Sequence, residues 1–575
     1  SPDGIDPAPV FKLGGQGNLQ IKVHRHAGPE RIWDTEVAAT AASDIRMMFK
    51  YWPYPVIVTG GRLVINATEV RAENVKFRGL NGGRATIDGR YYRESRETKK
   101  WRPDLTITAV DLPMDDLLLA TIRPPQDQWL RRMHLKGTLG AVARIIPDEN
   151  DRLTYRIETT MRGGESRPND GEYDLQSVDA RVILSPGLAK IESITARHGE
   201  STFSVTGAAS WSGGDAQVTV DMTGKDVRLQ DPIIHVIPHE QKMRDSLAEV
   251  FQRYDPAGGF DFKLNLKQGT ESGYRLHVEP DTLSFLFKNQ RLTLTDMSGS
   301  VEVTPGQIVL NQLAASWEHG RGKVSGTIDT TGDTPRVDTT IDAQIGEFDL
   351  TTRTVLPDGV ITLVDQLKLA GAIGVDAGRL TFGPDEDGTP RLDFQGDLHF
   401  DDARAQPGIA VTDLTGRMAI SASRRQGEKW PRVAVNLKAD QLRVLDRLIS
   451  PATLRLSNQA APNRFVIDEM RGDVYDGLIV GAGELWLGED PTYRVRVVVQ
   501  DAQVADVLNP RPQQVASATP QAPGSEVEGS TGLLSASLDL EGKIGDDATR
   551  RGRGELRVTD AKLYRTPLSL ALLQV

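Results

Sequence analysis

Few residues in this sequence have the types and spacing that catalysis or metal binding needs, and the histidines are considered first. His24 and His26 lie two apart, so on a strand they would share one face that could suit a metal ion, but no third ligand lies nearby. His235 and His239 lie four apart, but Pro238 between them disfavours the helix that would align them. We interpret both pairs as ordinary polar residues and predict no metal site.

The acidic residues lead to a similar result. Asp385, Asp387 and Gly388 resemble the start of a calcium-binding loop, but the bidentate glutamate that such a loop needs downstream is missing. A hairpin turn explains the same residues better. The sequence contains no G-x-S-x-G, G-x-x-x-x-G-K-[ST] or H-E-x-x-H motif, and it has no cysteine to serve as a nucleophile or zinc ligand. We therefore predict that the protein is not an enzyme and has no catalytic residues and no cofactor.

One surface segment leaves two interpretations open. Residues Arg90 to Arg102 are mostly basic and include Tyr91, Tyr92 and Trp101, so the segment could contact anionic lipid head groups. A solvated strand edge or loop is the commoner explanation, because Lys and Arg at an edge also prevent the addition of another strand.

The overall charge narrows the class of partner. The 575 residues include 68 Lys and Arg and 79 Asp and Glu, which gives a net charge of −11. This composition argues against nucleic acid as a partner, because phosphate binding needs a basic surface. No run of about 20 apolar residues is present to span a bilayer. The chain starts at Ser1 and stops within the apolar run Pro567 to Val575, so we expect a fragment of a longer protein whose anchor is missing.

The elements that must position any site are mainly β-strands. Apolar and polar residues alternate over short runs bounded by Gly, Asp, Asn and Pro, as at Val495, Val497 and Val499, which predicts long antiparallel meanders. Helices are few and short, and the best candidate is Glu240 to Tyr254, which has one apolar stripe. Shorter candidates are Asp115 to Thr121, Gln126 to Arg132, Ile361 to Leu369 and Gln441 to Ile449.

Three sequence units recur in the same order at a period of about 120 residues. The first has apolar residues in the pattern φ-x-φ-x-x-φ and then a strand with a central glycine. Its copies are Val70, Ala72, Val75 and Gly89; Ala189, Ile191, Ile194 and Gly207; Ile308, Leu310, Leu313 and Gly326; and Phe465, Ile467, Met470 and Gly483. The second is a strand that ends in φ-x-φ before a short, often helical segment, at Leu112 and Met114, Val227 and Leu229, Phe348 and Leu350, Ala502 and Val504, with an extra copy at Leu442 and Val444. The third is a glycine that opens a new strand, at Gly137, Gly258 and Gly371.

These repeats predict the domain organisation. We expect β modules at 1–136, 137–257, 258–370 and 371–508, and a Pro-, Gln-, Ala- and Ser-rich linker or loop at 509–530. A further region follows at 531–575.

Each predicted strand offers one apolar face that must meet something other than water. The few helices cannot cover such sheets, so the faces either close on each other as sandwiches or form a groove suited to acyl chains. The predicted fold class is a mainly β chain with an elongated, twisted, repeat-built antiparallel sheet that forms a hydrophobic groove, with a few short helices. The residues beside the repeated glycines would line the groove or, equally, a dry core: Ala85, Ile87, Tyr91, Phe203, Val205, Val324, Ile328, Ile479 and Leu485. The glycines themselves are expected to mark a bulge or bend.

The repeated glycine-centred strands, the strand-then-helix units and the closing sequence Gly552 to Tyr564 with its apolar tail resemble the AsmA-like family of bacterial envelope proteins, a group of bridge-like lipid-transfer proteins. The closing sequence resembles the C-terminal region of that family. The resemblance implies an inner-membrane-anchored periplasmic protein with a hydrophobic groove that moves phospholipid towards the outer membrane or supports outer-membrane assembly. Family members usually carry an N-terminal transmembrane helix, which this sequence lacks.

The function we predict is a non-enzymatic periplasmic scaffold that binds phospholipid or another acyl-chain lipid in its groove. Its further partners would be the membrane, through the missing anchor, and envelope proteins at its ends. The alternative is a structural or adhesive array of closed β-sandwiches that binds protein partners.

Overall fold

The computed structural model describes most of the chain. The described residues are 11–14, 16–27, 33–42, 44–49, 52–95, 100–122, 130–148, 153–168, 173–211, 216–229, 252–269, 272–287, 290–347, 364–365, 368–406, 410–444, 446–488, 490–508, 530–544 and 546–563. The chain forms two compact units: unit 1 comprises Ser1–Asp281 and Val303–Pro305, and unit 2 comprises Thr282–Glu302 and Gly306–Val575.

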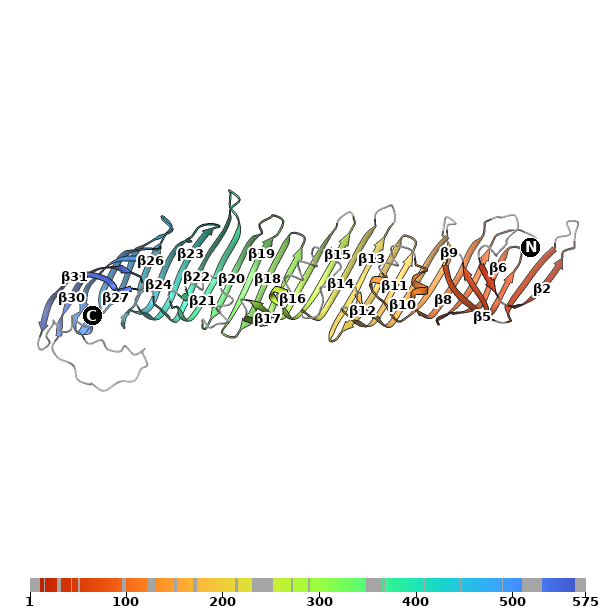
Figure 1. Ribbon diagram of the computed structural model, residues 1–575, viewed down its shortest axis with the longest axis horizontal. Helices are drawn as coiled ribbons and strands as arrows, with labels where there is room; N and C mark the ends of the chain where they lie inside the picture. Colours follow the sequence, from red (N-terminus) through yellow and green to blue (C-terminus); the bar gives the residue numbers. More distant parts are fainter. Residues whose placement is uncertain are drawn as a thin grey trace, which may run out of the picture. The chain divides into compact units, whose positions relative to one another are not determined.

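Unit 1 is an open antiparallel sheet. Its strands are β1 (Phe11–Gly14), β2 (Gly17–Arg25), β3 (Trp33–Ala41), β4 (Ile45–Phe49), β5 (Trp52–Ile65), β6 (Glu69–Gly79), β7 (Arg84–Tyr92), β8 (Arg102–Pro113), β9 (Thr138–Pro147), β10 (Leu153–Ser166), β11 (Leu175–Ser185), β12 (Leu188–His198), β13 (Ser201–Ser210), β14 (Gln217–Arg228) and β15 (Ala257–Gln268). From β5 to β15 each strand pairs with the next along the chain. Figure 1 shows these strands side by side, coloured from red to yellow.

Strands β16 (Gly273–Phe287) and β17 (Gln290–Thr304) contribute residues to both units. Unit 2 is likewise part of an open antiparallel sheet. Its further strands are β18 (Gln307–Trp317), β19 (Gly320–Asp329), β20 (Arg336–Ile345), β21 (Ala370–Pro384), β22 (Pro390–Ala405), β23 (Val411–Arg425), β24 (Arg432–Val444), β25 (Arg447–Ile449), β26 (Ala452–Ser457), β27 (Arg464–Val474), β28 (Gly477–Trp486), β29 (Thr492–Gln503), β30 (Ser530–Lys543) and β31 (Asp546–Leu563). They also pair in chain order, except that β26 pairs with β24 beyond the short β25.

The mainly β fold with few short helices is thus confirmed, because strands dominate the described part of the chain. The helices with described bounds are α1 (Asp116–Leu119) and α7 (Val504–Leu508). Helix α1 confirms the prediction at Asp115 to Thr121. It begins where the Asp115 carboxylate accepts a hydrogen bond from the backbone N–H of Leu118 at 2.9 Å.

Other helix predictions had mixed outcomes. The helix expected at Gln441 to Ile449 is wrong, because β24 runs on to Val444 and β25 then pairs back onto it. Of the helix predicted at Glu240 to Tyr254, only residues 252–254 are described, and they are helical. Residues 130–132 and 364–365 are also helical, but Lys368 and Leu369, at the end of the helix predicted at Ile361 to Leu369, are not. The remaining residues of these two predicted helices lie outside the described residues, as do Phe348, Leu350, His235, His239 and residues 509–529.

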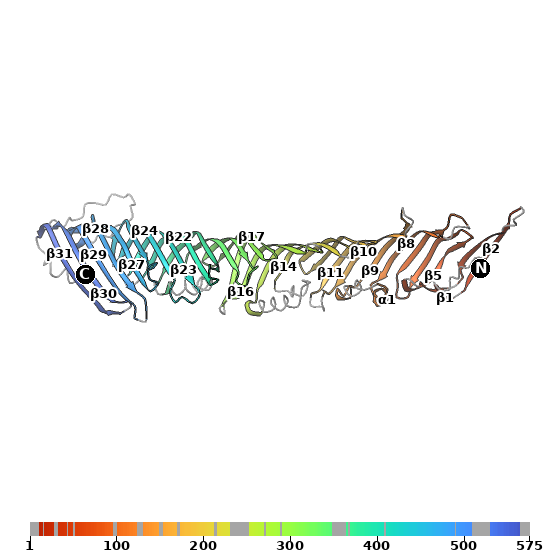
Figure 2. The ribbon, with the colours of Figure 1, turned by 90° about the horizontal axis from the view of Figure 1, so that it is seen from above.

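The ends of the strands form two long borders of the sheet in each unit, and we call these borders edges. The helix edge is the one where β8 ends before α1 in unit 1 and where β29 ends before α7 in unit 2. The opposite one is the hairpin edge. Figure 2 shows α1 at the helix edge of unit 1. Because successive strands are antiparallel, β7 and β28 end at the hairpin edge. The predicted strand-opening glycines Gly137, Gly258 and Gly371 lie at the starts of β9, β15 and β21, and all three have positive φ.

Candidate functional site

The candidate site is one face of the sheet in each unit, which we call the apolar face. Directly paired residues of antiparallel strands project to the same face, so the registers join single residues into rows that cross the sheet. One central row of unit 1 runs across β7 to β14 through Ile87, Ile107, Ala143, Ile157, Leu184, Ala189, Ala209 and Val218. Every member of this row is apolar.

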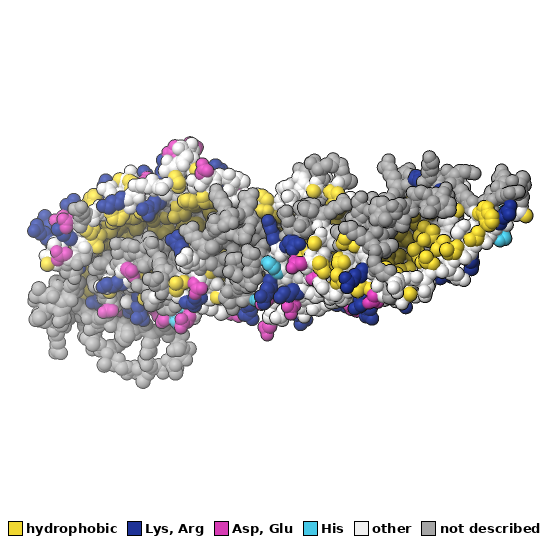
Figure 3. Space-filling view, turned by 45° about the vertical axis from the view of Figure 1, so that its right-hand side comes forward, with side chains coloured by type: hydrophobic (Ala, Val, Ile, Leu, Met, Phe, Trp, Pro, Cys, Tyr) yellow, Lys and Arg dark blue, Asp and Glu magenta, His cyan; other side chains and the backbone are white. Residues whose placement is uncertain are grey.

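Unit 2 has an equivalent row. It crosses β20 to β30 through Ala343, Val375, Leu398, Met418, Leu437, Leu454, Met470, Gly481, Val497 and Leu538. Figure 3 shows apolar side chains lining hollows on the visible face of both units. The apolar faces of the single strands, which the sequence predicted, therefore join into a continuous apolar surface within each unit.

The predicted lining residues all lie on this face. Each is paired across a neighbouring strand with a residue that belongs to the apolar face, and the pairs are Ala85 with Ala109, Ile87 with Ile107, Tyr91 with Pro103, Phe203 with Gly224, Val205 with Met222, Val324 with Ile341, Ile328 with Val337, Ile479 with Val499 and Leu485 with Tyr493. Phe203 is buried, Tyr91 is exposed, and the others are half-buried. The structure places Ala85, Ile87 and Tyr91 together in unit 1 and spreads the remainder over other strands.

Burial across the apolar face is uneven. Small buried clusters gather at the helix edge, around Val178 and Val227 in unit 1 and around Ala403 and Leu442 in unit 2. By contrast, no member of the two central rows is buried: all are half-buried except Leu538, which is 40% exposed. A sheet that closed on a second layer would bury its central residues, so the middle of each apolar face is open to solvent.

Sequence reasoning missed most of the central row of unit 2. Leu398, Met418, Leu437 and Leu454 come from four different strands and no repeated glycine marks them. Each does follow the period-two pattern of its own strand, which was the available signal. Their alignment into one row depends on strand registers, which turns and bulges set.

The φ-x-φ-x-x-φ pattern has a structural cause. In its first copy Ala72 pairs with Gly89 and Val75 pairs with Ile87, so β6 carries one more residue than β7 between these pairs. This is a β-bulge. Ala72 and Val75 are three residues apart and would project to opposite faces of a regular strand, but the extra residue brings Val70, Ala72 and Val75 to the apolar face. The same register shift occurs between Ile191 and Ile194, between Leu310 and Leu313, and between Ile467 and Met470.

The repeated glycine lies opposite each bulge, as the sequence predicted. Gly326 pairs with Leu310 at the start of the register shift and has a φ of +149°. A Cβ atom at this position would meet the carbonyl oxygen of Asp338 on the next strand at 2.2 Å. Glycine is therefore required here both for its conformation and for the close approach of β20.

Side chains satisfy the backbone at several bulges. The N–H of Asn74 donates to Asp88 Oδ1 at 2.7 Å, and the N–H of Ala377 donates to Asp342 Oδ1 at 2.8 Å. Asn74 and Ala377 both have positive φ. In each case the acceptor lies on a neighbouring strand, so the bulge is held by a bond between strands.

The opposite face of each sheet, the polar face, carries ion pairs between neighbouring strands. Arg379 donates two hydrogen bonds to Asp338, at 3.0 and 2.8 Å, and Arg496 does the same to Asp539, at 2.6 and 3.0 Å. These hydrogen bonds are the main reason that the pKa of each aspartate lies below its usual value. The polar face therefore presents fixed charges to water, whereas the central rows of the apolar face present none.

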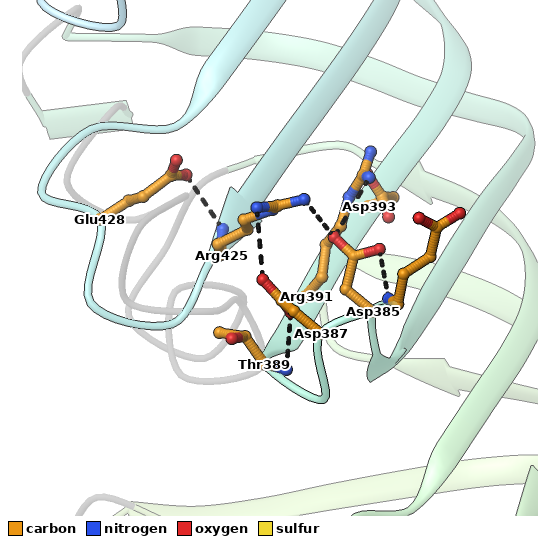
Figure 4. A network of polar contacts seen from close by, with 8 residues as sticks. Asp385, Asp387, Thr389, Arg391, Asp393, Arg425 and Glu428 are labelled. Carbon is orange, nitrogen blue, oxygen red and sulfur yellow. Dashed lines mark hydrogen bonds and ion pairs between the residues drawn. The ribbon is translucent and has the colours of Figure 1, made fainter.

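The predicted calcium-like residues form a hairpin turn, as the sequence favoured. Asp385 to Thr389 connect β21 with β22, and the Asp385 N–H donates to the Thr389 carbonyl oxygen at 2.9 Å. Figure 4 shows that Arg425 contacts the carboxylates of Asp385 and Asp387. Hydrogen bonds from Thr389 lower the pKa of Asp387. The turn is held by hydrogen bonds among its own residues and by Arg425 from β23.

The two N-terminal histidines are exposed. They lie at the end of β2 with their ring centroids 4.9 Å apart, and His26 pairs with Asp34. No group of three or more potential metal ligands occurs among the described residues. In the same part of the chain, no helix is long and apolar enough to cross a membrane.

Comparison with family models, with curated proteins and with solved structures finds no match for this chain. The resemblance to the AsmA-like family therefore stays a prediction from the sequence, and the geometry of the two apolar faces carries the functional argument.

Proposed function

We propose that the protein is a non-enzymatic scaffold that binds lipids, with acyl chains lying on the apolar face of each unit. The observation that carries this proposal is the partial exposure of the central rows, whose members are apolar and yet not buried. An apolar surface of this continuity is costly to leave in water and marks a surface for an apolar ligand.

The mechanism is passive shielding. Removing apolar surface from water contributes about 25 cal/mol per Å², or about 0.8 kcal/mol for each buried methylene group. The central row of unit 2 holds only Ala, Val, Leu, Met and Gly side chains, so it offers an acyl chain no polar partner at any single position. Such a surface binds longer acyl chains more strongly and does not fix a chain at one position.

The cellular setting belongs to the same proposal. The resemblance to AsmA-like envelope proteins supports a periplasmic location, an anchor in the inner membrane, and phospholipid transfer towards the outer membrane or support of its assembly. The polar faces, with their interstrand ion pairs, suit an aqueous compartment.

The direct test is native mass spectrometry of protein purified gently from its source, followed by organic extraction and lipid identification. We expect several phospholipids per chain. A chain that carries none, and gains none from phospholipid vesicles, contradicts the proposal.

A substitution in the central row tests the site itself. Leu437→Asp places a carboxylate in the middle of the apolar face of unit 2, and Asn436→Asp places the same group next to it on the polar face. We expect L437D to lose most of the lipid bound to unit 2 and N436D to keep it, as measured by extraction and mass spectrometry.

The melting temperatures of the same two variants distinguish an open apolar face from a closed core. On an open face the L437D carboxylate stays hydrated, so both variants should melt close to the wild type. If the face were a dry core, the buried unpaired charge would cost roughly 3–5 kcal/mol and only L437D would melt much earlier.

A further inference from the structure

An aromatic pair ends the apolar face of unit 1 at its hairpin edge. Tyr91 is the last residue of β7 on this face, in a row with Val70 and Pro103, and its side chain is exposed to 43%. The ring of Trp101 stacks on it, with the centroids 5.3 Å apart and the planes 14° from parallel. The pair therefore extends the apolar face to its rim.

A fixed guanidinium lies above this pair. The Cζ atom of Arg93 is 5.1 Å from the centroid of the Trp101 ring. Its Nε and Nη2 atoms both donate to the carbonyl oxygen of Ala67, at 2.9 and 2.7 Å, in the turn between β5 and β6. The two hydrogen bonds and the ring contact hold the cation at the rim in a defined position.

The other arginines of this segment do not share the apolar face with Arg93. Arg90 lies opposite Asp104 and Arg102 lies opposite Tyr92, so both project to the polar face, where Arg102 also contacts Glu94. Arg93 is the cation that contacts the aromatic pair, and it complements an anion that lies beside the apolar face.

Next to Tyr91 on the same face, Gly89 has no side chain and Ile87 follows it. No side chain of β7 projects from the apolar face between Tyr91 and Ile87, so an acyl chain can run from the rim towards the central row that begins at Ile87. Arginine is well suited to phosphate, and aromatic rings with one polar end suit the boundary between a head group and its chains.

We propose that Tyr91, Trp101 and Arg93 form a head-group site for a glycerophospholipid whose acyl chains lie on the apolar face of unit 1. Arg93 attracts the phosphate, while the stacked rings contact the glycerol and the first methylene groups. This inference rests on the proposed function and adds to it the residues that hold the head group and the edge at which the head group lies.

The test uses the photoreactive residue p-benzoylphenylalanine in place of Tyr91. A second protein carries it in place of Tyr493, which lies on the apolar face of unit 2 near its hairpin edge and serves as the comparison position. Each full-length protein is incubated with vesicles that contain phosphatidylglycerol or diacylglycerol with the same acyl chains, and cross-linked lipid is measured by mass spectrometry. Arg93→Gln in the same background should lower the phosphatidylglycerol adduct at position 91 about tenfold, since hydrogen bonds to charged groups have that effect. The diacylglycerol adduct and both adducts at position 493 should not change.

Controls separate charge from position. Arg464→Gln removes a guanidinium 5.9 Å from the Trp486 ring, in a pair of residues that lies on the polar face of unit 2, and should leave the adduct at position 91 unchanged. Arg93→Lys should restore part of the adduct if charge is needed, and thermal melting shows that each variant is folded. Glycerol phosphate in excess should fail to displace the lipid, because the site needs chains as well as an anion.

The outcomes are distinguishable. Equal loss with R93Q and R464Q, an unchanged phosphatidylglycerol adduct in R93Q, or displacement by glycerol phosphate overturns the head-group site and leaves the groove intact. Absence of any adduct at both positions with both lipids overturns the proposed function as well.

Discussion

Single glycines allow the strand opposite each bulge to approach the next strand of the sheet. Gly326 is the clearest case, because its φ of +149° and the nearby carbonyl oxygen of Asp338 both exclude a side chain. Its counterpart Gly207 has no positive φ, yet a Cβ there would still meet the Thr219 carbonyl oxygen at 2.4 Å. Close approach of the next strand is therefore the shared requirement, and unusual backbone conformation is an added one at some copies.

The substitution Gly326→Ala should lower the free energy of unfolding by about 1–3 kcal/mol, the usual cost of a side chain in a strained backbone conformation. Urea denaturation followed by circular dichroism measures the change. Gly488→Ala is the matched control in unit 2, because a Cβ there meets no atom within 4 Å. Equal stability of the two variants would show that β20 can move away without cost.

At this scale the sequence was a good guide to which residues face the apolar side. Alternation alone placed Val205 and Ile479 correctly, since one face of each strand repeats every second residue. The stacking of Trp101 on Tyr91 could not be read in the same way, because it depends on the path of the connection between β7 and β8.

Bulges are the elements that keep long strands in register with a single apolar face. In β21 the shift between Asp376 and Arg379 is accompanied by a positive φ at Ala377, whose N–H donates to Asp342 on β20. Without that acceptor, the bulge would hold a backbone donor that the sheet does not satisfy.

We expect Asp342→Ala to destabilise unit 2 by about 1.5–3 kcal/mol, the range for a hydrogen bond to a charged group. Asp342→Asn keeps a side-chain oxygen that can accept the same bond and should recover most of the loss. Chemical denaturation of the three proteins gives the comparison, and an asparagine variant as unstable as the alanine variant would refute the role of the acceptor.

Element prediction failed where one pattern fits two structures. Leu442, Leu445, Leu448 and Ile449 have helical spacing, and the sequence favoured a helix there. Two strands form instead: β24 runs to Val444, and β25 pairs back onto it with Ile449 opposite Leu442. Short apolar runs do not separate the two cases, because strand pairing decides the structure and the spacing of apolar residues does not report it.

At the scale of the whole molecule, sequence repetition and compactness give different divisions. The border between the two units runs through β16 and β17, inside the module predicted at 258–370. Within unit 1, β8 and β9 pair across the predicted module boundary at residue 137. The repeats are therefore units of sequence that share one sheet.

A cut between modules should not separate them. A protease site introduced after α1, at residues 120–122, would divide the chain but leave the hydrogen-bonded pairing of β8 with β9 intact. The cleaved pieces should elute together from a gel-filtration column and part only in denaturant, with the uncleaved protein as the control. Separate elution without denaturant would indicate independent closed domains, as the structural-array alternative requires.

Pairing in chain order also has a consequence for how the protein folds. From β5 to β15 each strand finds its partner in the segment that has just preceded it, so the ordering of one strand never waits for a distant part of the chain. Such local contacts lower the entropic cost of folding and allow structure to grow by one strand at a time from any hairpin. During synthesis or export from the N-terminus, each new strand could therefore pair with a preceding strand that is already folded.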